Sequence, residues 1–128
     1  MTRRRALLIF SIGLFAASSQ PRAAERTALP SERFVEGVED LPLMPGLANV
    51  EAAGVAFDTV TGRIVVAYAS GRVTREAVVA FYADTLPQLG WKKEQELRFR
   101  RDNENLTLEF SRNSAGLTVR FSLSPIKP

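Results

Sequence analysis

Cysteine and histidine are both absent from the 128 residues of the chain. Without cysteine there is no disulfide, no thiolate nucleophile or metal ligand, and no lipid attached at a leader cysteine. Without histidine the chain lacks the commonest general base, the commonest metal ligand and every Ser-His triad. Only oxygen ligands for a metal ion and carboxylates for acid–base chemistry remain. These two absences exclude most kinds of enzyme before any motif is considered.

The first residues have the pattern of a cleavable signal peptide. Arg3, Arg4 and Arg5 precede a mostly apolar run of 12 residues, Ala6 to Ala17, which small residues follow. Twelve residues are too few to cross a bilayer as a helix, which needs about 20. We therefore expect a signal peptide over residues 1–24 and a periplasmic or secreted protein.

The route of export and the cleavage site stay open. Cleavage after Ser18 or Ser19 satisfies the small-x-small rule, and cleavage after Ala24 is an alternative. The segment 2–8 also resembles a twin-arginine signal, but its apolar run favours the general secretory route.

Cleavage before Glu25 changes the charge of the chain. The precursor has a net charge of +3, but the leader takes four arginines with it, leaving 13 Lys and Arg against 14 Asp and Glu, a net charge of −1. A nucleic-acid partner is therefore not expected. Residues 25–54 hold six acids and two bases, whereas residues 55–128 hold eight acids and eleven bases. We expect an acidic, Pro-containing extended arm over 25–54 and one folded domain over 55–128.

The arm has apolar residues between helix-breaking ones. Pro42, Pro45 and Gly46 exclude a long helix in residues 34–50. We expect the apolar side chains of the arm to lie across the domain that follows, with a docking segment for a partner as the alternative.

The domain begins with a hairpin and a helix. Residues 54–58 and 62–69 are typical of two strands joined by a tight turn. Thr74 is a favourable N-cap for a helix that Pro87 and Gly90 end. Its apolar stripe at three-and-four spacing comprises Val78, Val79, Phe81, Tyr82, Leu86 and Leu89.

Three alternating segments follow the helix. Residues 91–101, 106–111 and 117–123 alternate apolar and polar side chains, which indicates an antiparallel meander with one dry and one wet face. The order of hairpin, helix and three-stranded meander predicts an α+β fold, a two-layer sandwich with one amphipathic helix on one face of an antiparallel sheet. Trp91 is expected to cap the core between helix and sheet.

The helix region resembles a known kind of protein. The run Ala77 to Trp91, with its Phe-Tyr, Leu and Gly-Trp, resembles small exported bacterial α+β domains of uncharacterised function, over about residues 62–124. The resemblance implies the fold and a bacterial envelope location. It implies no catalytic residue, because the motif consists of core and capping residue types.

The wet face of the sheet carries the candidate binding residues, Arg98, Arg100, Arg120 and Glu109, together with Glu96, Thr107 and Thr118. Arginine binds carboxylates and phosphates through two parallel hydrogen bonds. Such a face fits an acidic partner, a polysaccharide or lipid headgroups. It also fits the acids of the chain's own arm, Glu36, Glu39 and Asp40.

The carboxylates show no pattern of a catalytic or metal site. Glu94 and Glu96 are expected on the wet side of one strand, flanked by basic residues, which is typical of a solvated face. The turn 102–105 lacks the glycine and the distal glutamate of a calcium loop. We therefore predict no catalytic residue, no metal site and no cofactor, and a protein that is not an enzyme.

The function that these patterns favour is non-enzymatic. We expect an exported domain that binds another macromolecule, a protein or an envelope component, or acts as an envelope accessory factor. One alternative is a binder of small anionic ligands or lipid headgroups through the arginines, with peripheral membrane contact. A hydrolase that uses carboxylates alone is the remaining alternative. The sequence predicts no oligomeric state.

Overall fold

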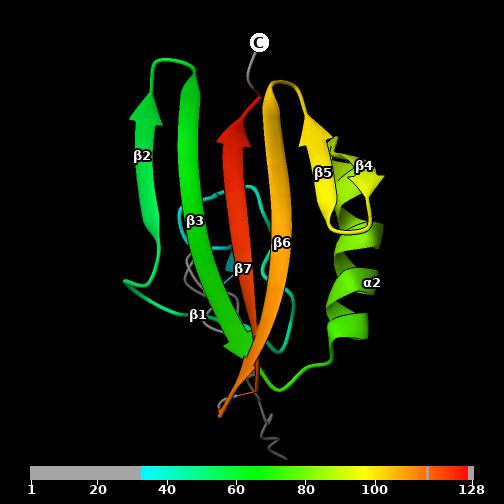
Figure 1. The fold of residues 1–128 in the computed structure, drawn as a ribbon. Helices are drawn as coiled ribbons and strands as arrows, with labels where there is room; N and C mark the ends of the chain where they lie inside the picture. The colour runs from blue at the N-terminus through cyan, green and yellow to red at the C-terminus, as the bar shows by residue number, and fades with distance from the viewer. Residues whose placement is uncertain (1–32, 115, 127–128) are drawn as a thin grey trace, which may run out of the picture.

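One antiparallel sheet organises the computed structural model of the chain, which describes residues 33–114 and 116–126 (Figure 1). The signal peptide and the first part of the arm lie outside these residues. In chain order the elements are β1 (Ala48–Asn49), β2 (Val55–Thr59), β3 (Gly62–Gly71), α2 (Arg75–Thr85), the 3-10 helix η2 (Leu86–Leu89), β4 (Lys92–Gln95), β5 (Arg98–Arg101), β6 (Glu104–Asn113) and β7 (Gly116–Pro125).

The strands run β1–β3–β7–β6–β5–β4 across the sheet, and β2 also pairs with β3. Short β1 lies against Ala69 and Ser70, whereas β2 lies against residues 62–66, so the two follow one another along the same edge of β3. The other edge of β3 pairs with β7, which joins the hairpin to the meander. The α+β fold of hairpin, helix and meander is therefore confirmed.

The expected single strand over residues 91–101 is wrong. Lys92–Gln95 and Arg98–Arg101 are two strands that fold back on each other around Glu96 and Leu97, with Lys92 opposite Arg100. The meander has four strands. The turn was missed because it contains none of the Gly, Pro, Asn or Asp residues that usually mark one.

Helix α2 begins and ends where the sequence indicates. The hydroxyl of Thr74 accepts a hydrogen bond from the N–H of Ala77 at 3.1 Å, which satisfies one donor of the first turn. Pro87 lies in η2, which ends the α-helix at Thr85, and Gly90 takes the left-handed conformation with φ of 92°.

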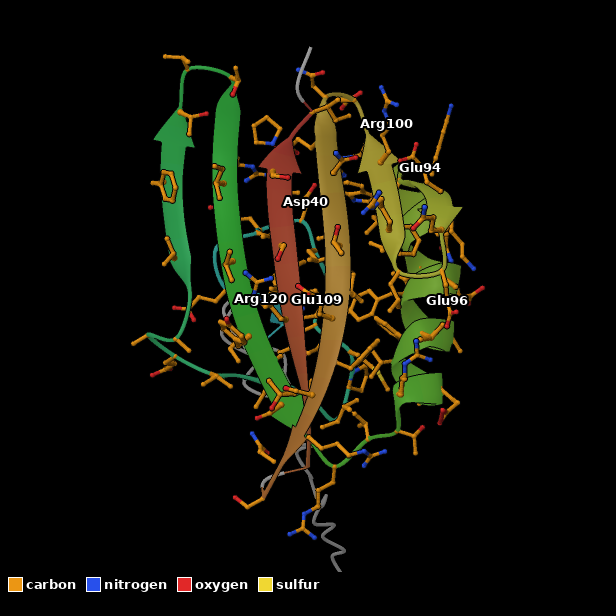
Figure 2. All side chains as sticks on the ribbon, in the orientation of Figure 1. Asp40, Glu94, Glu96, Arg100, Glu109 and Arg120 are labelled. Carbon is orange, nitrogen blue, oxygen red and sulfur yellow. The ribbon has the colours of Figure 1, made fainter. Side chains whose placement is uncertain are left out.

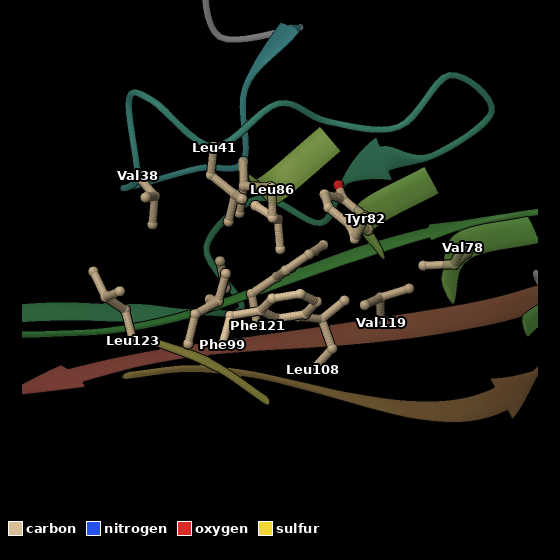
Figure 3. Packing of buried hydrophobic residues seen from close by; sticks show 14 of the residues in the cluster. Val38, Leu41, Val78, Tyr82, Leu86, Phe99, Leu108, Val119, Phe121 and Leu123 are labelled. Atoms are coloured by element: carbon tan, nitrogen blue, oxygen red, sulfur yellow. The ribbon is translucent and has the colours of Figure 1, made fainter. Parts of the chain in front are cut away.

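The core lies on one face of the sheet, which we call the core face (Figure 3). Alternate residues of β3, β6 and β7 point into it, and α2 and the arm cover it. The arm buries Val35, Val38, Leu41 and Leu47, so the expectation that its apolar side chains lie across the domain is confirmed. Trp91 is also buried, as expected.

Candidate functional site

The opposite face of the sheet, which we call the open face, is covered by no other described segment (Figure 1). Period-two alternation places on it the side chains between those of the core face. They are Val55 and Phe57 of β2, Ile64, Val66 and Tyr68 of β3, Thr118, Arg120 and Ser122 of β7, Thr107 and Glu109 of β6, and Arg98 and Arg100 of β5. The open face is apolar along β2 and β3, polar in the middle and basic along β5.

All four predicted binding residues lie on the open face, but they do not form one cluster. Arg120 lies opposite Glu109 and donates to its carboxylate at 2.5 Å and to the hydroxyl of Tyr68 at 3.2 Å (Figure 2). These hydrogen bonds, Tyr68 first and Glu109 second, raise the pKa of Arg120. The guanidinium of Arg120 is thus already bound within the protein.

The other two arginines lie at the far end of the open face. Arg98 is opposite Thr107, and Arg100 is opposite Asn105 and beside Lys92. Arg100 contacts the Glu94 carboxylate at 3.9 Å, with about half of its side chain exposed (Figure 2). This basic end is more accessible than Arg120.

Glu96 does not belong to the open face. It lies in the turn between β4 and β5 and contacts Arg75 of α2 at 3.3 Å (Figure 2). Glu94 and Glu96 therefore contact different arginines and do not form a pair of carboxylates on one strand.

The acidic arm does not reach the open-face arginines. It lies on the core face, where Asp40 accepts a hydrogen bond of 2.6 Å from Arg101. Arg101 also stacks on Trp91, 4.4 Å from the ring centroid, and donates to the carbonyl of Leu89. The expectation that the arm's acids face Arg98, Arg100 and Arg120 is wrong for Asp40, because its partner is on the other face of β5.

Sequence reasoning missed the most exposed apolar surface, which we call the β2 tip: Val55, Phe57 and Val60. These three residues are 53%, 52% and 104% exposed. The strand pattern identified Val55 and Phe57 as strand residues. The sequence could not show that β2 is an edge strand, because strand order depends on contacts far along the chain.

A small pocket of about 190 Å³ lies beside the same strand. Its floor is formed by β3 residues Val65–Ala67 and its wall by Gly54–Ala56. Glu36 and Gly37 of the arm close the other side. The pocket thus lies on the core-face side of the β2–β3 pair and has one acidic residue, Glu36, in its lining.

No charged residue is buried in the part of the chain that the structure describes. The carboxylates of Asp40, Glu94, Glu96, Glu104 and Glu109 each contact an arginine. Within the same residues no three acids gather as they would around a metal ion. The described side chains therefore suit binding: those of the open face can bind charged or hydrogen-bonding groups, and those of the β2 tip can bind apolar groups. None of the described helices has the length and apolar character needed to span a bilayer.

Comparison with known proteins gives a family and no individual relative. No curated protein matches the chain, and no solved structure matches it. A family model described as START domain-like matches residues 50–126, which include the open face, the β2 tip and α2 but not residues 33–49 of the arm, which cover the core. This match spans more than half of the sequence, so the chain belongs to the START domain-like family.

Proposed function

We propose that this protein is a non-enzymatic exported domain that binds another macromolecule, a protein or envelope component, through the β2 tip. The observation that supports it is the exposure of Val55, Phe57 and Val60 on one hairpin. Fully burying one such side chain contributes about 1.5–3 kcal/mol, so a partner that covers all three gains a substantial free energy. Membership of a START domain-like family favours a binding role.

The binding proposal is tested by recovery of a partner from envelope extracts. The chain is immobilised as wild type, as Phe57→Ser and as the control variant Leu89→Ser, which changes an exposed apolar residue at the end of η2. Wild type and Leu89→Ser should retain the same partner, and Phe57→Ser should lose most of it. Equal recovery by all three would remove the β2 tip from the binding surface.

Export is tested separately from binding. The full chain is expressed in a bacterial host, the cells are fractionated, and the intact mass gives the N-terminus. A periplasmic form that begins at residue 19, 20 or 25 supports the proposal. An unprocessed cytoplasmic form that folds normally contradicts it.

The basic end of the open face favours a second candidate function, binding of a small anion or lipid headgroup. Arg98 and Arg100 lie next to each other on this face, with Lys92 beside Arg100. Binding to anionic phospholipid vesicles should weaken in Arg98→Ala and Arg100→Ala and stay unchanged in Arg112→Ala, a matched change at the end of β6. A hydrolase that uses carboxylates alone has less support, because such an enzyme needs an acid held in a buried site and none of the described acids is buried.

A further inference from the structure

We propose that the free edge of β2 binds an extended strand of a partner protein in which apolar and basic residues alternate. The inference rests on the proposed function, because it specifies the partner of the β2 tip. It is supported by three separate features of the described residues: an unprotected strand edge, a difference between the two faces of β2, and the pocket beside Ala56.

The outer edge of β2 is unpaired within the described residues. β2 pairs with β3 along its inner edge from Val55 to Thr59. An edge strand directs every second pair of backbone N–H and C=O groups away from its neighbour, and proteins usually protect such edges with lysine, proline or a bulge. The β2 sequence Val-Ala-Phe-Asp-Thr has no lysine, proline or bulge, and its one charged residue, Asp58, disfavours an acidic strand but not a basic one. A further strand with basic residues can therefore add by backbone hydrogen bonds.

The two faces of β2 select different side chains in the added strand. Val55 and Phe57 lie on the open face, whereas Ala56 and Asp58 lie on the core-face side, opposite Val65 and Arg63. Directly opposed side chains in neighbouring strands lie about 5 Å apart and interact. Apolar residues of the added strand would therefore meet Val55 and Phe57.

The pocket accounts for the basic residues of the added strand. Because Ala56 is small, a long side chain entering from the added strand can lie over it and place its stem against Val65 and Ala67. Glu36, the acidic residue of the pocket lining, would then attract the charged end. A lysine or arginine fits this path, since it combines an apolar stem with a cationic end.

The remaining charges on this side of β2 also favour a basic strand. Asp58 follows Ala56 on the same side. Arg63, the basic residue opposite it, contacts Glu104 at 3.1 Å, and that hydrogen bond is the main cause of its raised pKa. Glu104 therefore partly compensates the charge of Arg63, and Asp58 and Glu36 remain available to a cationic partner.

A second copy of the chain fits this edge less well. Two β2 strands from two copies would pair antiparallel, with one residue of each at the centre of symmetry. If Asp58 is that central residue, the two Asp58 carboxylates lie opposite each other. Pairing about Phe57 or Ala56 places Asp58 of the other copy beside Ala56 or Gly54, which line the pocket with Glu36. Each register brings like charges together.

The test measures fluorescence anisotropy of a short labelled peptide in which valine and lysine alternate, added to the chain as purified from the host. Two probes serve as controls: a valine–glutamate peptide, and a valine–lysine peptide with alternate backbone amides N-methylated so that they cannot donate. Protein variants are Glu36→Lys, Phe57→Ser and the control Glu39→Lys, an arm acid outside the pocket lining. Thermal unfolding shows whether each variant folds.

The valine–lysine peptide should bind to wild type and to Glu39→Lys, and both control peptides should bind much more weakly. Reversing the charge of this lining residue in Glu36→Lys should weaken binding about three- to tenfold. Phe57→Ser should weaken it by about tenfold. Equal binding of the N-methylated peptide, equal binding of the glutamate peptide, or no effect of Glu36→Lys would overturn the inference.

Failure of this inference is distinguishable from failure of the proposed function. A Phe57-dependent envelope partner together with no peptide binding would reject strand addition and leave the β2 tip as a binding surface. A dimer of wild type that Phe57→Ser dissociates, seen by sedimentation, would instead show that a second copy occupies the edge and would overturn the choice of a foreign strand.

Discussion

Tyr82 connects the helix, the arm and the sheet through one side chain. Its hydroxyl donates to the carbonyl of Pro42 at 2.7 Å and accepts from the N–H of Met44 at 3.2 Å. Its ring meets Phe121 of β7 edge-on, with centroids 5.5 Å apart. The apolar stripe predicted that Tyr82 faces the core. It could not show why the residue is tyrosine, because the two backbone partners lie about 40 residues earlier in the chain.

Replacing Tyr82 with phenylalanine should lower the free energy of unfolding by about 1–3 kcal/mol, because two partly buried backbone groups lose their partner. Urea unfolding measures the loss. Tyr68→Phe is the matched control, since Tyr68 only accepts from Arg120 on the open face. Its loss should stay below about 1 kcal/mol. Equal losses in the two variants would contradict the role of the arm contacts.

The same hydroxyl predicts a dependence of stability on pH. Burial raises the pKa of Tyr82, an effect that the hydrogen bond from Met44 only partly opposes. The unfolded tyrosine ionises near pH 10, so above this pH the folded state binds more protons than the unfolded state. The free energy of unfolding should therefore fall as pH rises above about 10, and the difference between wild type and Tyr82→Phe should narrow between pH 8 and 11. A constant difference would contradict the buried phenol.

Arg101 has a similar connecting role at the edge of the core. Arg101→Ala removes the group stacked on Trp91 and the partner of Asp40. Since Trp91 is the only tryptophan, quenching of its fluorescence by acrylamide should increase, while stability falls by about 1 kcal/mol. Arg100→Ala, one residue earlier and on the open face, should leave quenching unchanged. Equal quenching in both variants would show that Arg101 does not shield Trp91.

At the scale of elements, the sequence predicted the features that depend on residues close together in the chain, such as the ends of the helix and the faces of the strands. Helix α2 begins after the Thr74 cap and ends at Thr85, two residues before Pro87, so both signals lie within a few residues of the ends they set. Alternation also placed Arg98, Arg100, Arg120 and Glu109 on one face. The pairing of Arg120 with Glu109 and Tyr68 depends on the register of three strands, which alternation alone does not fix.

The end of β3 shows a contact between elements that the sequence could not indicate. Gly71 lies two residues beyond the expected strand of residues 62–69, but it ends β3, and the carbonyl oxygen of Gly46 lies directly against it. A Cβ at Gly71 would lie 1.9 Å from that oxygen, a distance that no real contact allows. Only glycine lets the arm approach β3 this closely.

Gly71→Ala should therefore displace the arm and lower the free energy of unfolding by about 1–3 kcal/mol or more. Thermal or urea unfolding measures this, with Ser70→Ala as the neighbouring control. Hydrogen exchange should also be faster at Leu47, whose N–H bonds to the carbonyl of Met44 in the same arm turn. A Gly71→Ala variant as stable as Ser70→Ala would contradict the close approach.

At the scale of the whole molecule, the core is shared between the family domain and a segment outside it. The START domain-like match begins at residue 50, but Val35, Val38, Leu41 and Leu47 of the arm are part of the same buried cluster. The sequence predicted that the arm lies across the domain. It did not predict which face the arm covers, because Pro42, Pro45 and Gly46 leave only irregular backbone whose path is set by distant contacts.

A fragment of residues 50–126 should therefore fail to fold cooperatively. Burial of the four aliphatic side chains of the arm contributes on the order of 6–12 kcal/mol, which equals most of the stability of a typical domain. The fragment should bind a hydrophobic dye and show a broad urea transition, whereas residues 33–126 should unfold in one sharp step.

Adding a peptide of residues 33–49 should restore part of the cooperativity, and the same peptide with Val38 and Leu41 changed to serine should not. If the fragment unfolds sharply at the same urea concentration as residues 33–126, the core is complete without the arm. The opposite result would make the arm a structural part of this domain, and a partner that displaced it would then have to supply an equivalent apolar surface.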